Sequence, residues 1–369
     1  MLTFFVSSSY IKSTSRTADC RQAILWPFTN ESAWNTPLGS SAEFVCANLF
    51  NTSRGQGYEA FYNFHSDDDY VIITTASDPL VPWYNQGHWG GPATKEAYCN
   101  ITGKFVKELH FPFNLTIQMW GNNNAAGLLQ PDGRTLFTMQ PLYVCDPGSP
   151  ILAFDFSNAY PTDIMNDTGE IGGHGGSGLS AVGGTIRLGE LSPESGPIRH
   201  ALKLELFAHL WYYRPLDGNH SNCYRWPANT CDGYAFDTSS SDCYNGTDSN
   251  VRPGTLLAVP SQNVASVNAM LKTLPAKKLL QALSQYGGYL VDDTAWNSTS
   301  ICTEHGVADE FMNNYGFSFT VNDNTGGPNL NWYEDLLLLF RSLYVVVNND
   351  ESNIGGGGTP IAPLAPPFC

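Results

Sequence analysis

Short runs of apolar and β-branched residues alternate with turn residues along most of the chain. The following runs have the length and composition of β-strands: DYVIITT (69–75), KFVKELHF (104–111), LTIQMW (115–120), TLFTMQPLYV (135–144) and ILAFDF (151–156). In LLQPDGRTLF (128–137), Asp132 and Gly133 can adopt the positive φ angles of a tight turn, which predicts a hairpin. The pattern favours an all-β fold, a β-sandwich or jelly roll.

Helical periodicity appears only late in the chain. The segment AKKLLQALSQYGG (276–288) places three leucines on one face and ends at two glycines. The segment NWYEDLLLLFRSLY (331–344) has acidic residues near its start, where the helix dipole favours them. We therefore expect a few short helices near the C-terminus, over 276–287 and 333–344, packed against the sheet.

Changes in composition divide the chain into three parts. Residues 1–19 read as a short apolar strand followed by a polar tether. Residues 20–348 read as a single large β-rich domain, and residues 349–369 as a Gly- and Pro-rich tail that we expect to be extended.

The charge balance narrows the classes of partner. The 34 Asp and Glu residues exceed the 18 Lys and Arg residues and give a formal net charge of −16, which repels nucleic acid and anionic lipid. No apolar run is long enough for a transmembrane segment. Aromatic residues make up 13% of the chain and charged residues only 14%, a balance typical of extracellular β-rich proteins.

Cysteines and glycosylation sequons indicate a secreted protein. The 9 cysteines lack the close CxxC spacing of a zinc site, so we predict no metal site but a framework of at least three disulfides. Oxidised cysteines and Asn-x-Ser/Thr sequons occur together in proteins of the secretory pathway, which predicts an extracellular or cell-surface glycoprotein. The sequon asparagines are Asn30, Asn51, Asn100, Asn114, Asn166, Asn219, Asn245 and Asn297.

The first ten residues have two interpretations. They are either the remnant of a signal peptide or a strand of the mature protein. Leu2, Phe4, Phe5 and Val6 make this segment apolar on both faces, and the polar tether that follows could carry it to a neighbouring subunit. A strand donated in this way completes an open sheet edge and builds filaments head to tail.

Candidate chemistry begins at GGHGGSGLSAVGGTIRLGEL (172–191). Glycines surround His174 and permit close backbone approach, as either a ligand-binding loop or a sharp β corner requires. The loop lacks the Lys-Ser/Thr ending of a phosphate-binding loop. The strand predicted after it carries Arg187 and Glu190.

Further polar residues follow within apolar strands. His200 has the strand parity of three leucines, which favours a buried structural histidine over a catalytic base. Asp292 and Asp293 end the run YLVDD, and Glu304 follows in CTEHG. These groups could serve a polysaccharide hydrolase or lyase as acid, base or nucleophile, or they could form a buried ion-pair network.

Two weaker signals concern ligands. Asp67, Asp68 and Asp69 in HSDDDY offer oxygen ligands for calcium, although a solvated turn explains them as well. No other cofactor is predicted. Four tryptophans could stack on sugars or pack in a core. They are Trp83, Trp89, Trp120 and Trp226.

Several longer motifs carry a resemblance. They are, in order, ILWPFTNESAWNTPLG, NNAAGLLQPDGRTL, GGHGGSGLSAVGGTIRLGEL, GPIRHALKLELFA, YRWPANTCDGY, PGTLLAVP and QYGGYLVDDTAW. Over roughly residues 24–310 the chain resembles a family of secreted microbial proteins that look like carbohydrate-associated extracellular domains, some of them joined to sugar-binding modules. The resemblance implies one continuous domain with a surface role and no assigned catalytic residues.

The sequence leaves three hypotheses for function. The first is a glycosylated structural subunit that self-assembles head to tail into a filament or coat, with homo-oligomeric neighbours as its partners. The second is a polysaccharide-active enzyme, a hydrolase or lyase. The third is a non-catalytic carbohydrate-binding module, so that glycans are the expected partners in the last two.

Overall fold

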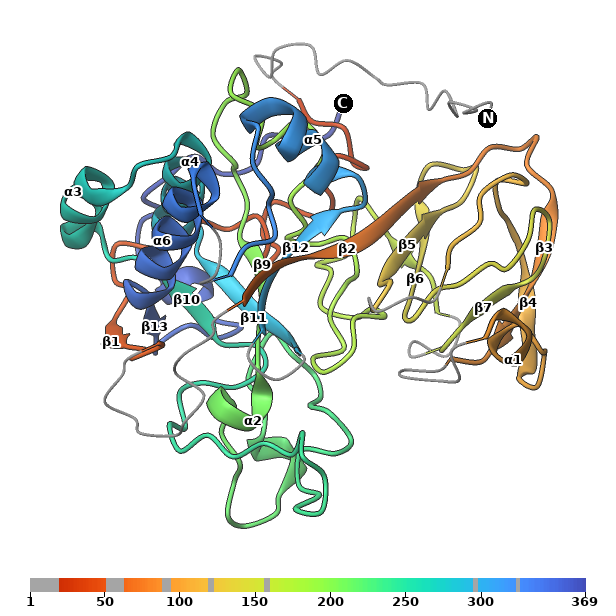
Figure 1. Cartoon of the computed structure of the whole chain (residues 1–369), viewed down its shortest axis with the longest axis horizontal. Helices are drawn as coiled ribbons and strands as arrows, with labels where there is room; N and C mark the ends of the chain where they lie inside the picture. Colours follow the sequence, from red (N-terminus) through yellow and green to blue (C-terminus); the bar gives the residue numbers. More distant parts are fainter. Residues whose placement is uncertain are drawn as a thin grey trace.

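The computed structural model describes residues 20–50, 63–87, 94–118, 123–155, 160–294, 298–322 and 326–369. Its main element is a ten-stranded mixed sheet in the order β1-β13-β10-β11-β9-β12-β2-β5-β6-β8. In that order, the strands are Phe44–Cys46, Tyr344–Val346, Leu256–Ala258, Gly288–Asp293, Leu202–Leu206, Ser298–Glu304, Asn63–Ile73, Ala126–Leu129, Thr135–Met139 and Thr162–Asp163. A second sheet contains β4 (Lys104–His110), β3 (Leu80–Asn85) and β7 (Ile151–Ala153). Figure 1 shows the long strand β2 running from the middle of the large sheet toward this smaller sheet.

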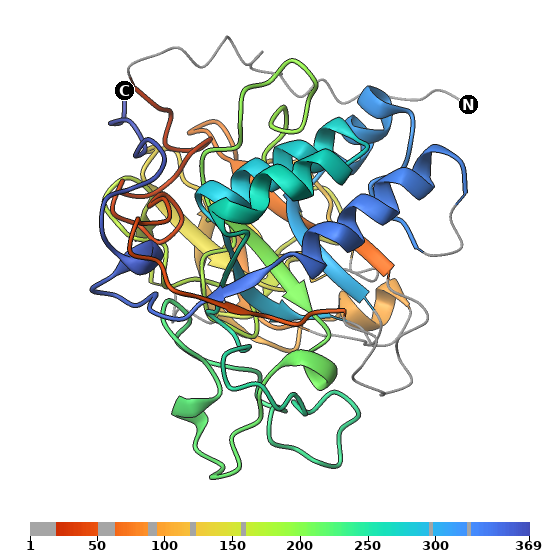
Figure 2. The ribbon, with the colours of Figure 1, turned by 90° about the vertical axis from the view of Figure 1, so that its left-hand side faces the viewer.

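Helices are distributed along the chain. Those of the described residues are α1 (Lys95–Tyr98), α2 (Ala208–Trp211), α3 (Ser261–Met270), α4 (Leu274–Gln285), α5 (Val307–Tyr315) and α6 (Pro328–Arg341). Helices α3, α4 and α6 lie together over one face of the large sheet (Figures 1 and 2). The all-β prediction is therefore wrong, and the protein has a mixed α/β fold.

The physical reasons for this error lie in the strands and in two helices. Apolar runs of four to eight residues do not show whether neighbours pair parallel or antiparallel, and here β12 runs parallel to β2, and β9 to β11. Helix α3 buries only Val267, so its sequence has little amphipathic signal. In α5 the core contact rests on Val307 and Phe311, one turn apart.

Other local predictions fared differently. The hairpin is confirmed, with β5 and β6 pairing around a turn in which Gly133 has φ of 69°. Helices α4 and α6 lie where the late periodicity indicated. The predicted strand after the glycine-rich loop is instead a series of turns with one bridge between Ile186 and Thr303, because Gly184 and Gly189 have positive φ angles.

Three disulfides are present, and one of them joins the two ends of the described chain. They are Cys20–Cys369, Cys99–Cys145 and Cys223–Cys231. Beside the first, the backbone N–H of Arg21 donates to the carbonyl of Pro367 at 2.8 Å, so the C-terminal segment packs against the start of the described chain. No helix in the described ranges is long and apolar enough to cross a membrane.

The described sequon asparagines are all exposed to solvent. They are Asn30, Asn100, Asn114, Asn166, Asn219 and Asn245. Asn51 and Asn297 lie outside the described residues, as does the apolar segment with Leu2, Phe4, Phe5 and Val6. The surface position of the six is what glycosylation requires.

Candidate functional site

The glycine-rich loop holds His174 against the large sheet. The loop closes on itself through hydrogen bonds from Gly172 N to Gly178 O at 2.8 Å and from Gly178 N to His174 O at 2.9 Å. A Cβ added to Gly173 would lie 2.4 Å from the backbone nitrogen of Met139. The glycines are therefore required for close packing of the loop, and this packing leaves His174 only 1% exposed.

His174 covers a polar face in the middle of an otherwise apolar sheet. In β9, Leu202, Leu204 and Leu206 point to one face of the sheet, whereas Lys203 and Glu205 point to the other. The register places Glu205 beside Ser300 of β12, and Cys302 beside Asp67 of β2. Neighbouring strands thus bring Glu205, Cys302, Asp67 and Asp69 to the side on which His174 lies.

A bulge in β11 adds Asp292 to this face. Leu290 pairs with Leu204, but Asp292 pairs with the next residue, Glu205, so Val291 is the extra residue of the bulge. Strict alternation would have given Asp292 the parity of Leu290 and turned it away from His174. Because of the bulge, Asp292 Oδ2 lies 3.4 Å from His174 Nδ1.

Both nitrogens of the His174 ring face acidic groups. Nε2 lies 3.7 Å from Glu205 Oε1, 3.7 Å from Asp69 Oδ1 and 3.8 Å from Cys302 Sγ. The Cys302 thiol donates to Glu205 Oε1 at 3.3 Å. Asp69 Oδ2 accepts from Lys203 Nζ at 2.7 Å and from the hydroxyl of Thr185 at 2.6 Å, and Lys203 is fully buried.

Burial shifts the ionisation of several of these groups. Desolvation, aided by repulsion from Asp69, raises the pKa of Asp67 to about 6, and desolvation also raises the pKa of Glu205 well above its usual value. Desolvation raises the pKa of the Cys302 thiol as well. Cys302, His174 and Asp292 have the order of a cysteine nucleophile, base and orienting acid, but a buried thiol of raised pKa is a poor nucleophile.

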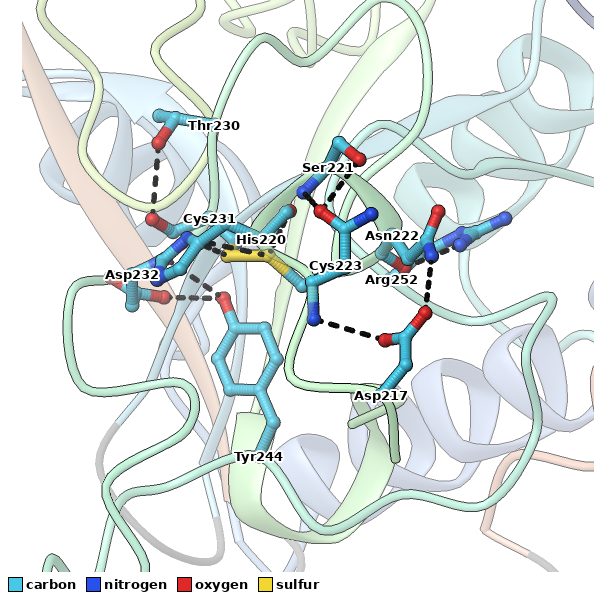
Figure 3. The surroundings of a disulfide bond; sticks show 11 residues. Asp217, His220, Ser221, Asn222, Cys223, Thr230, Cys231, Asp232, Tyr244 and Arg252 are labelled. Carbon is cyan, nitrogen blue, oxygen red and sulfur yellow. Dashed lines mark hydrogen bonds between the residues drawn. A yellow bond between two sulfur atoms is a disulfide. The ribbon is translucent and has the colours of Figure 1, made fainter. Parts of the chain in front are cut away.

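The cluster approaches the surface beside Gly176, between two carboxyl groups. A Cβ added to Gly176 would lie 2.6 Å from Asp292 Oδ1 and 3.3 Å from Asp232 Oδ2. Asp232 is half-buried, and its Oδ2 accepts a hydrogen bond from the hydroxyl of Tyr244 at 2.6 Å (Figure 3). Desolvation, followed by repulsion from Asp292, raises the pKa of Asp232 to about 7.

Asp292 is held by nitrogen donors. Its Oδ2 accepts from Asn123 Nδ2 at 3.0 Å and from Gln140 Nε2 at 3.2 Å, while Oδ1 accepts from the backbone N–H of Asp293 at 2.9 Å. These N–H dipoles stabilise a negative charge on the carboxylate. The remaining oxygen capacity is on Oδ1, the atom nearest Gly176.

Asp293 has a local structural role. Its Oδ1 accepts the backbone N–H of Ala208 at 2.6 Å, at the start of α2, and its Oδ2 accepts the Tyr234 hydroxyl at 3.0 Å. Burial and the nearby Asp232 raise the pKa of Asp293 well above its usual value. The two adjacent aspartates of the run YLVDD therefore have separate partners.

The other predicted site residues form ion pairs away from His174. Arg187 Nε lies 2.8 Å from Glu304 Oε2, and His200 Nε2 lies 3.0 Å from Glu190 Oε2. These contacts are what the alternative of a buried ion-pair network describes. Arg187 and His174 thus contact different carboxylates.

The acidic run and two of the tryptophans lie in surroundings that differ from those suggested by the sequence. Asp67, Asp68 and Asp69 lie in strand β2 rather than in a turn, and Asp68 pairs with His305 at 3.0 Å while its two neighbours point to the buried cluster. Trp83 is fully buried, so it cannot stack on a sugar. Trp226 is partly buried and donates to Glu170, whereas Trp89 and Trp120 lie outside the described residues.

His220 lies beside two cysteines that could bind a metal only if they were not joined in a disulfide. His220 Nδ1 lies 3.5 Å from Cys231 Sγ and 3.9 Å from Cys223 Sγ, but the two sulfur atoms are bonded to each other (Figure 3). A disulfide supplies no thiolate, so this group offers a metal only the imidazole.

Sequence reasoning did not single out Asp232, Tyr244, Gln140 or Cys302 as site residues. The one available signal was the alternation LKLEL in residues 202–206, which places two ionisable residues on one face of an apolar strand. Comparison of the chain with known family models, with curated proteins and with solved structures finds no match.

Proposed function

We propose that the protein is a secreted glycan-cleaving hydrolase of the retaining type, with Asp232 as general acid and base and Asp292 as nucleophile. The observation that carries the proposal is the meeting of these two carboxyl groups beside Gly176. Asp292 Oδ1 and Asp232 Oδ2 can be no farther apart than the two Cβ distances combined, which is below the roughly 6.5 Å minimum separation of inverting glycosidases. This spacing supports direct attack by a carboxylate rather than by an intervening water.

The environments of the two groups support different roles. Asp232, with its pKa raised to about 7, keeps a proton that it can donate to the leaving oxygen. Asp292 has its charge stabilised by N–H donors and can form the bond to the sugar carbon through Oδ1. Asp232 would then take a proton from the water that releases the sugar and restores the Asp292 carboxylate.

The charge of the site favours a neutral or amino sugar over a uronate. The groups around Gly176 and His174 are acidic, and the cation paired with Asp69, Lys203, is fully buried. A lyase must neutralise a uronate carboxylate before a proton is removed, and the contacts of the described site residues include no accessible cation for that step. A hydrolase therefore fits better than a lyase.

Disulfides and surface sequons support secretion. The chain has three disulfides, and its six described sequon asparagines are exposed. Both features suit an enzyme that meets polysaccharide outside the cell. The filament hypothesis depends on residues 1–10, which lie outside the described residues, and it stays a prediction.

The test uses mechanism-based labelling. Protein from a secretory host is incubated with activated 2-deoxy-2-fluoro glycosides of neutral sugars and activated 5-fluoro glycosides of amino sugars. Both trap the glycosyl ester on a nucleophile, and the labelled peptide is sequenced by mass spectrometry. We expect the label on Asp292, and we expect polysaccharide cleavage, measured as new reducing ends, to fall as pH rises through about 7 because Asp232 loses its proton.

Matched variants give the decisive comparison. Asp232→Asn should lower the rate of cleavage by 10²-fold or more, roughly the contribution of a general acid. Asp237→Asn, an exposed position in the same loop, should leave the rate unchanged. Labelling at another residue, full activity of Asp232→Asn, or no cleavage and no label across the panel would each refute the proposal.

A further inference from the structure

Four buried side chains from four segments point their donor atoms at one small volume of the core. They are Asp67 of β2, His174 of the glycine-rich loop, Glu205 of β9 and Cys302 of β12, and one donor atom of each lies within 4.8 Å of all the others. We propose that they form a structural site for one divalent metal ion of the zinc class. Its four ligands are not the carboxyl groups of the proposed hydrolase, although Asp292 lies beside both sites.

Three separations among the four donor atoms are close to those of a tetrahedron around zinc. Bonds of about 2.0–2.1 Å to nitrogen and oxygen and of about 2.3 Å to sulfur place tetrahedral ligand atoms roughly 3.3–3.6 Å apart. His174 Nε2 lies 3.7 Å from Glu205 Oε1 and 3.8 Å from Cys302 Sγ, and these two atoms are 3.3 Å apart. The separation of Nε2 from Oε1 is too long for a hydrogen bond, whereas the two contacts of the thiol are within the range of sulfur hydrogen bonds, and all three suit ligands that share an ion.

Two carboxylate oxygens beside these ligands lack hydrogen-bond partners. Asp67 Oδ2 and Asp69 Oδ1 are buried and have no hydrogen-bond partner. An unsatisfied buried acceptor is costly, and native proteins pair the great majority of such groups. A cation bound to Asp67 would satisfy its oxygen and would also attract the free oxygen of Asp69.

A cation would balance the buried carboxylates if they are ionised. Lys203 balances Asp69 at 2.7 Å, which leaves Asp67 and Glu205 without a fixed positive partner. One divalent ion would neutralise these two carboxylates, and the Cys302 thiol would release its proton on binding, which leaves one net negative charge among the four ligands. The alternative is that they stay protonated, a state in which the core needs no metal, and the experiment below distinguishes the two.

The second ring nitrogen of His174 lies beside a carboxylate. Nδ1 is 3.4 Å from Asp292 Oδ2 and makes no hydrogen bond within the described residues, and a metal at Nε2 would fix Nδ1 as an N–H donor toward this carboxylate. Gln140 and Asn123 in turn fix that carboxylate. The prediction of no metal site was based on the lack of CxxC spacing. That criterion detects only ligands that are close in sequence, and here each ligand belongs to a different segment.

The ligand set and its burial define the kind of metal and its role. A thiolate, an imidazole and two carboxylates favour zinc over calcium or magnesium, which prefer oxygen ligands alone. All four residues are at most 8% exposed, and four protein ligands leave no open position for substrate. The ion would therefore join β2, β9, β12 and the glycine-rich loop as a structural element.

The first test measures metal in the full-length protein. We expect about one zinc ion per chain after purification from a secretory host without added chelator. X-ray absorption at the zinc edge should show one sulfur at about 2.3 Å and three nitrogen or oxygen ligands at about 2.0–2.2 Å. A protein without zinc that also fails to bind added Zn²⁺, or a zinc shell without sulfur, would overturn the proposal even if no variant folds.

The second test identifies the ligand with Co²⁺ as the probe. Wild-type protein exchanged with Co²⁺ should show a sulfur-to-cobalt charge-transfer band, which Cys302→Ser should lose. Cys243→Ser is the matched control, because Cys243 is also a buried, unpaired cysteine with a histidine nearby, and it should keep the band. Loss of the band in the control but not in Cys302→Ser would refute the assignment of the ligand.

Discussion

Replacing Asp232 by asparagine should remove the proton donor and, at the same time, stabilise the fold. The asparagine keeps the shape of the side chain and can still accept the hydrogen bond from Tyr244. It cannot ionise, so the cost of a charge in this half-buried position disappears. The size of that gain depends on pH in a way that the structure specifies.

The magnitude follows from the pKa. A carboxyl with an unfolded pKa of about 3.9 and a folded pKa of about 7 is fully protonated in both states at low pH, where it favours neither. Between these values the unfolded chain releases the proton more readily, so wild-type stability falls by up to about 1.4 kcal/mol per pH unit. Above pH 7 the accumulated cost is constant, at most about 4 kcal/mol.

The assay is urea unfolding of wild type and Asp232→Asn at several pH values from 4 to 8, with the disulfides intact. The difference in the free energy of unfolding should be near zero at pH 4, should grow in favour of the variant up to pH 7, and should then stay level. Asp237→Asn should give no such gain, because Asp237 is exposed and hydrogen bonds from Ser239 lower its pKa. A difference that does not change with pH, or a variant less stable at pH 8, would show that Asp232 is not held protonated in the fold.

Three further predictions concern other parts of the molecule. Gly176→Ala should abolish glycan cleavage, and in thermal unfolding it should destabilise the fold more than Gly133→Ala does. Both glycines have positive φ, but only at Gly176 would the added methyl group lie 2.6 Å from a carboxylate oxygen, so equal effects of the two substitutions would contradict this reasoning. Cys369→Ser should lower the free energy of unfolding by about 2–5 kcal/mol in urea, since the disulfide closes nearly the whole described chain, and an unchanged midpoint would argue against a closed ring. If the protein assembles by strand donation, removing residues 1–10 should leave a folded chain that no longer assembles, and light scattering that shows the same assemblies from the truncated chain would exclude strand donation.

Several features of this protein could be read from local sequence. The turn at Gly133 and the helices near residues 280 and 335 follow from periodicity and turn chemistry, which act between near neighbours. The cysteine count predicted disulfides, and three are present. The alternation in LKLEL also assigned Lys203 and Glu205 to one face of their strand.

The candidate site depended on contacts that local sequence does not contain. Asp292 faces His174 only because the bulge at Val291 shifts the register by one residue, and the alternation of the sequence favours the opposite face. Asp232 has a raised pKa because the fold partly buries it and also places it beside Asp292. The mixed α/β arrangement was likewise missed, because parallel and antiparallel strands share the same apolar runs.

The sequence therefore determined which segments are apolar, where tight turns occur and that disulfides would form. The tertiary structure decided which polar residues meet and whether water reaches them. A carboxylate on a strand is an ordinary surface group until another segment covers it. Here the glycine-rich loop covers the polar face of β9, β12 and β2, and the loss of solvent raises the pKa of the acids beneath it.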